Sequence, residues 1–184
     1  MAQQKQNSIN GGSDMRHAAQ SLRHVLLVSL ATLVGVLGIG YAQQATEEPN
    51  DADALKGVKT MKVVYDIDGV TEPKKMVVFL KAIADARDRA VAAEVKPDLV
   101  VAFRGPALKL IQKRSPDATE EQKQIAELVA DLKKGGAKME ACNFAVQVLK
   151  LDREAFLPEV KVVANSFNSL GGYHAKGYGI VPVQ

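Results

Sequence analysis

Hydrophobic residues in this chain follow two patterns, short β-branched runs and longer stretches with helical spacing. The short runs predict five strands, at 59–66, 98–103, 138–141, 161–164 and 178–183. The run at 98–103, DLVVAF, is apolar almost throughout, which is typical of a strand buried on both faces of a sheet. The segments between these strands decide the fold class.

Those segments predict helices. From 73 to 94 apolar residues recur at helical spacing, and Pro73 suits the first turn. A second helix begins after Thr119, which with Gln122 has the spacing of a capping box, and ends at Gly135-Gly136. Shorter helices are predicted at 107–112 and 144–149, a turn at 152–157, and a loop with a short helix at 166–176.

Alternating strands and helices predict an α/β protein. Crossovers of this kind give a mainly parallel five-stranded sheet with helices on both faces, a three-layer α/β/α arrangement. In such sheets, ligands and reactive groups gather beyond the carboxyl ends of the strands. The residues expected there are 66–69, 104–105, 142–143 and 165–166.

A different pattern occupies the N-terminus. Residues 25–41 contain no charge, a basic flank precedes them, and Gly40, Tyr41 and Ala42 provide a small-residue exit. This predicts a secretory signal peptide over residues 1–42, with Met15 as an alternative start. An uncleaved membrane anchor is the competing interpretation. In either case the rest of the chain is expected to be periplasmic or otherwise exported, with a flexible leader at 43–57 and a folded domain at 58–184.

The net charge changes meaning once the export segment is set apart. The whole chain carries +3, but Lys5, Asp14, Arg16 and Arg23 all lie in the first 24 residues. The remainder is therefore close to neutral, and no electrostatic argument for nucleic-acid binding is left. A single cysteine excludes an intrachain disulfide and any multi-cysteine zinc site. No metal and no cofactor is expected.

Cys142 is the main candidate for chemistry. It follows a predicted strand and precedes a predicted helix, whose N-terminal amides would favour the nucleophilic thiolate form. A free thiol in an exported protein calls for an explanation, because that compartment oxidises exposed thiols. The alternative is an inert, buried cysteine that acts as a small hydrophobic residue. The sequence leaves both interpretations open.

Three further residues are supporting candidates. Arg104, beyond the second strand, could offer its guanidinium to an anionic sulfur species, or could be a surface or ion-paired arginine. Asn143 lies beside Cys142 at the same strand end. His174, the one histidine beyond the export segment, could donate a proton to a sulfur centre, or could be an exposed loop residue.

Several other chemistries are excluded by spacing. A phosphatase loop requires an arginine six positions after its cysteine, and Val148 stands there. The glycine-containing segment at 171–179 has no Gly-Lys-Ser/Thr, so it is not a phosphate-binding P-loop. Its glycines do not follow the first strand, so they form no dinucleotide fingerprint.

Several strings resemble a known family, namely AFRGPALKLIQ, LKKGGAKMEACNFA, LPEVKVVANSF and GYHAKGYGIVPV. Together they resemble the DsrE/DsrF-like sulfur-relay family, in its exported branch, over about 59–184. The resemblance implies a DsrEFH-like fold assembled as a homo-oligomer, often a trimer or hexamer. It also implies that Cys142 matches the cysteine on which better-studied members carry sulfur as a persulfide. Other members lack this cysteine or have no known activity.

Two functions follow as hypotheses. In the first, Cys142 accepts sulfane sulfur as a persulfide and passes it on, with a sulfur donor or acceptor protein as partner and with no metal or nucleotide. In the second, the protein is a non-catalytic oligomeric binding or assembly module of the cell envelope, and Cys142 is a structural core residue. The first is a sulfur carrier or sulfurtransferase-like protein, so whether the chain is an enzyme stays open.

Overall fold

The computed structural model describes residues 48–113 and 115–184. The predicted signal peptide, the alternative membrane anchor and the alternative start at Met15 lie outside the described residues. One compact unit spans Asn50–Gln184. Among the residues that the structure describes, no helix has the length and apolar character needed to cross a membrane.

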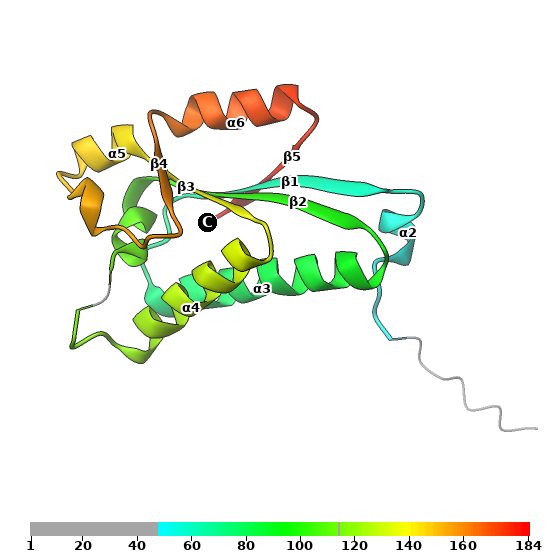
Figure 1. The fold of residues 1–184 in the computed structure, drawn as a ribbon, viewed down its shortest axis with the longest axis horizontal. Helices are drawn as coiled ribbons and strands as arrows, with labels where there is room; N and C mark the ends of the chain where they lie inside the picture. The colour runs from blue at the N-terminus through cyan, green and yellow to red at the C-terminus, as the bar shows by residue number, and fades with distance from the viewer. Residues whose placement is uncertain (1–47, 114) are drawn as a thin grey trace, which may run out of the picture. The chain divides into compact units, whose positions relative to one another are not determined.

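The centre of this unit is a five-stranded sheet in which every pairing is parallel (Figure 1). The strand order is β4-β3-β2-β1-β5. All five predicted strands are present, with ends that differ by at most two residues from the predicted ones. Their bounds are β1 Thr60–Ile67, β2 Lys96–Phe103, β3 Lys138–Cys142, β4 Lys161–Val163 and β5 Gly179–Val183.

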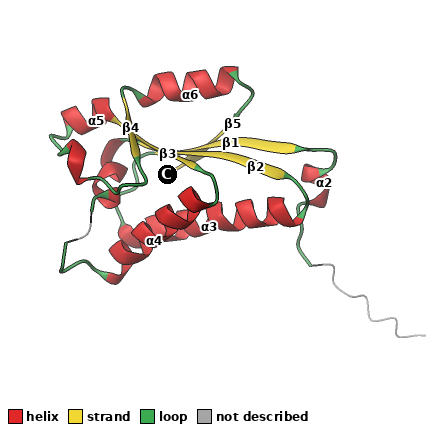
Figure 2. Cartoon of the chain, in the orientation of Figure 1, coloured by secondary structure: helices red, strands yellow, loops and turns green. Residues whose placement is uncertain are grey.

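Helices cover both faces of the sheet, so the predicted three-layer α/β/α arrangement is confirmed. Figure 2 shows α3 (Pro73–Ala92) and α4 (Glu120–Lys134) on one face, with α5 (Asn143–Val148) and α6 (Ser166–Ala175) on the other. Two 3₁₀ turns, η1 (Gly105–Ile111) and η2 (Arg153–Ala155), complete the connections. The capping box before α4 is present, with Thr119 and Gln122 exchanging side-chain and backbone hydrogen bonds.

The segment 166–176 differs from its prediction, because α6 is one continuous helix and not a loop with a short helix. The Asn165 side chain caps it by accepting a hydrogen bond from the Phe167 N–H. Leu170 and Tyr173 then pack against the sheet. These tertiary contacts outweigh the weak helix propensity of Gly171 and Gly172.

The segment 43–57, predicted to be a flexible leader, contains a short helix, α2 (Ala52–Leu55). The Asn50 side chain accepts a hydrogen bond from the Ala52 N–H at its start. The compact unit therefore begins before Val58, where the domain boundary was predicted. A four-residue helix leaves almost no periodic signal in the sequence, which is why the prediction missed it.

Strand β5 forms one edge of the sheet and pairs only with β1. The Asp68 N–H donates to the Val183 carbonyl, so Val183 and Val181 direct their backbone groups toward β1. Ile180 and Pro182 direct theirs outward. Pro182 has no N–H, and this blunts the free edge against pairing with another strand.

The main hydrophobic core lies between the sheet and the α3/α4 layer. It is built from fully buried side chains of both layers, among them Leu80, Val101, Phe103 and Leu132. The core under α6 is much smaller and consists of Val64, Val100, Ala102 and Tyr178. Space on that face is shared with polar side chains, which form the candidate site.

Candidate functional site

The register of the sheet brings three residues from the predicted strand ends to one edge. Ile67 is paired with Phe103, and Phe103 with Ala141, so these strands end in the same row. The next residues along the three strands are Asp68, Arg104 and Cys142. Side chains alternate between faces along a strand, and Cys142 shares its face with Glu140 and Lys138, beneath α5 and α6.

Cys142 ends β3 and is the N-cap residue of α5. Its side chain is buried, with 4% of the residue exposed. The sulfur accepts a hydrogen bond from the Ser166 backbone N–H, at 3.4 Å between N and Sγ. Ser166 is the first residue of α6, so the thiol lies at the junction of two helix starts.

This environment favours the thiolate. Burial alone would raise the pKa of the Cys142 thiol. The Ser166 hydroxyl and the backbone N–H groups of Ser166, Ala145 and Phe144 act in the other direction, and together they bring the pKa below its ordinary value. The N-terminal amides of α5, which the sequence predicted, therefore help to lower the pKa of the thiol. Helix α6 adds donors that the junction of β3 and α5 alone did not suggest.

Arg104 lies close to this thiol, but its guanidinium is already engaged. Nε and Nη2 donate to the two carboxylate oxygens of Asp66, at 2.7 and 3.0 Å. Nη1 forms an ion pair with Asp68 at 2.8 Å. Of the alternatives for Arg104, the ion-paired arginine is therefore the one present. Hydrogen bonding to Asp66 and the negative charges of Asp68 and Cys142 outweigh desolvation and raise the pKa of Arg104.

The backbone next to Arg104 is adapted to this cluster. Gly105 has φ +55°, a conformation that side chains disfavour, and an added Cβ there would collide with Asp68 Oδ1. The Phe167 ring covers the guanidinium, with 5.6 Å between the Arg104 carbon Cζ and the ring centroid. The start of α6 thus touches both Cys142, through Ser166, and Arg104, through Phe167.

Two buried polar atoms have no hydrogen-bond partner among the described residues, Asn143 Oδ1 and Ser166 Oγ. Ser166 is 2% exposed, and its hydroxyl is near enough to the sulfur to stabilise the thiolate without meeting hydrogen-bond geometry. Asn143 was a predicted supporting residue. Ser166 was placed at the sheet edge by its position after a strand, but the sequence carried no signal for its contact with Cys142.

His174 is not brought to this site. It lies in the last turn of α6, about 12 Å along the helix axis from Ser166, and it is exposed. The geometry therefore gives no support to a role for His174 as a proton donor to the Cys142 sulfur.

Large apolar side chains are exposed on α5 and α6. Phe144 and Val148, one turn apart on α5, and Phe167 on α6 are each more than half exposed. Exposed aromatic residues beside a buried reactive group are typical of a surface that meets a partner.

A network of buried and partly buried polar side chains lies further along the same face. Glu140 accepts hydrogen bonds from Ser169 Oγ, at 2.6 Å, and from the Tyr173 hydroxyl, at 2.8 Å. Desolvation, together with the hydrogen bond to Glu140 and its charge, raises the pKa of Tyr173 to about 12. Asp98 accepts from Lys138 and from the hydroxyl of Tyr178, which packs edge-on against the Tyr173 ring.

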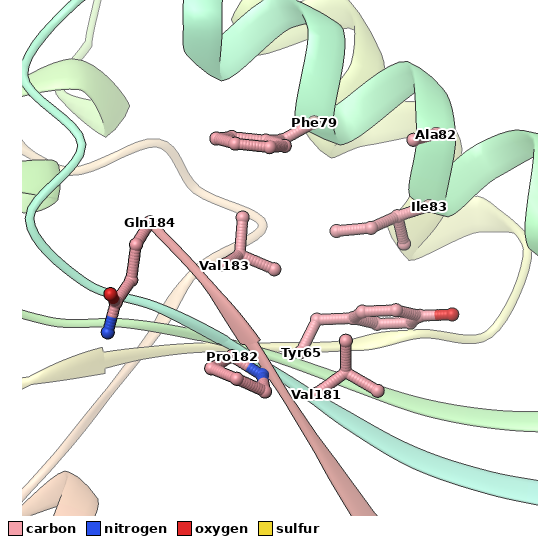
Figure 3. A pocket seen from close by; sticks show the side chains of 8 residues that line it. All are labelled: Tyr65, Phe79, Ala82, Ile83, Val181, Pro182, Val183 and Gln184. Carbon is pink, nitrogen blue, oxygen red and sulfur yellow. The ribbon is translucent and has the colours of Figure 1, made fainter.

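A separate cavity lies elsewhere in the described part of the chain. Figure 3 shows it between α3 and β5, lined by apolar side chains that include Phe79, Ile83 and Val181, with a volume of about 520 Å³. It lies on the opposite face of the sheet from Cys142 and has no reactive side chain, so it carries no part of the candidate chemistry. No group of three or more potential metal-ligating residues was found among 48–113 and 115–184.

Comparison with known families agrees with this architecture. A model of the DsrE/DsrF-like family matches residues 61–183, which is most of the compact unit. The chain belongs to the DsrE/DsrF-like family. No curated protein sequence matches this DsrE/DsrF-like protein.

Two solved structures are similar to this DsrE/DsrF-like protein. The protein of unknown function MTH1491 from Methanobacterium thermoautotrophicum shares 15% identity, with a TM-score of 0.54, and the match covers 66% of this chain and 98% of that one. The ychN protein from E. coli shares 10% identity, with a TM-score of 0.49 and the same coverage. At these identities the first likeness supports the fold alone.

Proposed function

We propose that this protein carries sulfane sulfur as a persulfide on Cys142 and transfers it to a partner, as an exported member of its family. The observation that carries the proposal is the sulfur of Cys142 at the junction of β3 and α5, where hydrogen-bond donors lower the pKa of its thiol. Family membership supports it, because the family is known for sulfur relay. Whether the protein acts as a carrier or as a transferase depends on its partner.

The chemistry requires only the thiolate and a sulfur donor. The Cys142 thiolate attacks the outer sulfur of a donor persulfide, a new S–S bond forms, and the donor leaves as a thiolate. In release, an acceptor thiolate attacks the outer sulfur now on Cys142, and Sγ departs with the bonding electron pair. No external oxidant or reductant is consumed, because one S–S bond replaces another in each step.

Intact mass spectrometry tests this proposal directly. After incubation with polysulfide or thiosulfate, the wild-type protein is expected to gain about 32 Da, the mass of one sulfur atom, and to lose it on treatment with a reductant. The Cys142→Ser variant is the matched control, and it should stay unmodified. A wild-type mass that does not change, or the same gain in Cys142→Ser, would remove the proposal.

A second candidate function is the non-catalytic assembly module, and the burial of Cys142 is the observation that favours it. Here the protein forms a homo-oligomer, such as a trimer or hexamer, and the exposed Phe144, Val148 and Phe167 contact another subunit. Iodoacetamide labelling separates the two functions. Labelling of Cys142 only after unfolding supports the module, whereas labelling of the native protein near neutral pH supports the sulfur carrier.

A further inference from the structure

Ser166 stands out among the buried polar residues that the structure describes because its hydroxyl has no hydrogen-bond partner there. The residue is 2% exposed, and its Oγ makes no hydrogen bond to any described oxygen or nitrogen. A buried hydroxyl without a partner is normally avoided, since it has lost its hydrogen bonds to water. The Ser166 backbone N–H already donates to Cys142 Sγ, so the same residue holds a second donor beside the same atom.

We propose that Ser166 is the positioning residue for the sulfur chemistry, and that its hydroxyl and its N–H hold Sγ in the thiolate form during loading and release. This inference rests on the proposed function of Cys142 and adds the group that controls it. A thiolate accepts hydrogen bonds but donates none, so the hydroxyl turns its proton toward the sulfur when the thiolate is present. The sulfur of a neutral thiol is only a weak acceptor, so the same hydroxyl gains less from it.

Stabilising Sγ as a thiolate makes the S–S bond easier to break during sulfur release. When an acceptor thiolate takes the outer sulfur, the S–S bond breaks and Sγ leaves with both electrons. A leaving sulfur that is better stabilised as a thiolate departs faster. The Ser166 N–H is hydrogen-bonded to that leaving sulfur, and the hydroxyl of the same residue is the second donor that we assign to it.

Removing the Ser166 hydroxyl leaves the other charged groups near the sulfur unchanged. Arg104, paired with Asp66 and Asp68, faces the sulfur from the ends of β1 and β2. Glu140 shares its strand and face, and α5 contributes no acidic or basic residue. The ionisable side chains of α6 are Tyr173, bonded to Glu140, and His174, in the last turn. A change in pH profile after removal of the hydroxyl therefore reports on the hydroxyl.

The Ser166→Ala variant tests the inference with two readouts. Removing a hydroxyl that bonds no described oxygen or nitrogen leaves no other buried group unsatisfied, so the thermal unfolding midpoint is expected to stay within a few degrees of wild type. The pH profile of iodoacetamide labelling should shift to higher pH, with labelling at neutral pH about tenfold slower. Release of persulfide sulfur to a small thiol should slow as well.

The matched control is Ser169→Ala, one turn further along α6, whose hydroxyl bonds Glu140 and not the sulfur. Its labelling profile should coincide with wild type, while its unfolding midpoint falls. A Ser166→Ala profile identical to wild type would overturn the inference, as would a shift of equal size in Ser169→Ala. The proposed function fails separately, through the absence of a persulfide on wild-type Cys142, so the two failures are distinguishable.

Discussion

The two faces of the sheet are built on different principles. The face under α3 and α4 is packed almost entirely with apolar side chains, and the largest of them are fully buried. The face under α5 and α6 has a small apolar core and carries Asp66, Asp98, Glu140 and Cys142 from three adjacent strands. Each of the three carboxylates there is hydrogen-bonded to a cation or a hydroxyl.

This difference separates stability from chemistry within one small unit. The apolar face supplies most of the hydrophobic free energy of folding, in proportion to the area that it buries. The polar face contributes less of that energy, because each buried carboxylate must be paired to offset its desolvation. In return it places fixed donors and charges around one sulfur atom. Damage to the first face should reduce stability most, whereas damage to the second should reduce it less and should also change the ionisation of its side chains.

The largest loss of stability is expected when a substitution creates a cavity in the apolar face. Leu80 in α3 is fully buried in the main core, so Leu80→Ala should lower the free energy of unfolding by about 3–4 kcal/mol. Urea titration followed by circular dichroism measures this. Val78→Ala, on the same helix at an exposed position, is the control and should change the value by less than about 0.5 kcal/mol. Equal losses at the two positions would contradict the packing described for α3.

A smaller effect is expected from breaking the ion pair of the polar face. Arg104→Gln leaves the Asp66 carboxylate without its bidentate partner, and we expect a loss of about 2 kcal/mol, moderated by the partial exposure of Arg104. Adding Asp66→Asn removes the unpaired charge and should recover part of that loss. Urea titration of both single variants and of the double variant measures the coupling. Strictly additive losses would show that Arg104 and Asp66 have no coupling energy, so that their ion pair does not stabilise the fold.

The smallest loss of stability is expected from removing the Tyr173 hydroxyl, and this loss depends on pH. In the folded state the pKa of Tyr173 is raised to about 12, whereas an unfolded tyrosine releases its proton near pH 10. Between these values the unfolded state loses a proton that the folded state keeps, so the stability that Tyr173 contributes is complete below about pH 10 and declines toward pH 12.

Thermal unfolding measured from pH 8 to pH 11.5 checks this prediction. Tyr173→Phe removes the hydroxyl bonded to Glu140, and we expect a loss of about 1 kcal/mol at pH 8. Because phenylalanine does not titrate, the difference from wild type should narrow above pH 10. A difference that stays constant across the range would assign the alkaline loss of stability to other groups.

Much of the fold could be predicted because its elements carry local signals. The strand at 98–103 is apolar on both sides, and Thr119 with Gln122 marks a helix start within four residues. The parallel direction of the strands then follows from the alternation of strands and helices. Helix α6 was only partly predicted, because Gly171-Gly172 read as a loop and the contacts of Leu170 and Tyr173 with the sheet are invisible in sequence.

The site could be predicted only as far as chain position determines it. Parallel strands end at one edge, so Asp68, Arg104 and Cys142 were expected together. What each side chain does there depends on partners far away in sequence. Arg104 binds Asp66 across 38 residues, and Ser166 meets Cys142 across 24. No local pattern encodes such pairs, so sequence reasoning named Arg104 but missed its partners, and it left Ser166 without a role.

The position of β5 in the sheet has a consequence for folding during synthesis. Strand β1 lies early in the compact unit, and its outer neighbour is the last strand of the fold. During synthesis, the backbone donors and acceptors along that side of β1 have no partner until residues 179–183 emerge from the ribosome. An eight-residue strand with one unpaired edge is a template for misassembly with other nascent chains. Holding this chain unfolded until it is complete would protect it, and the export that we propose would have this effect if the chain crosses the membrane before it folds.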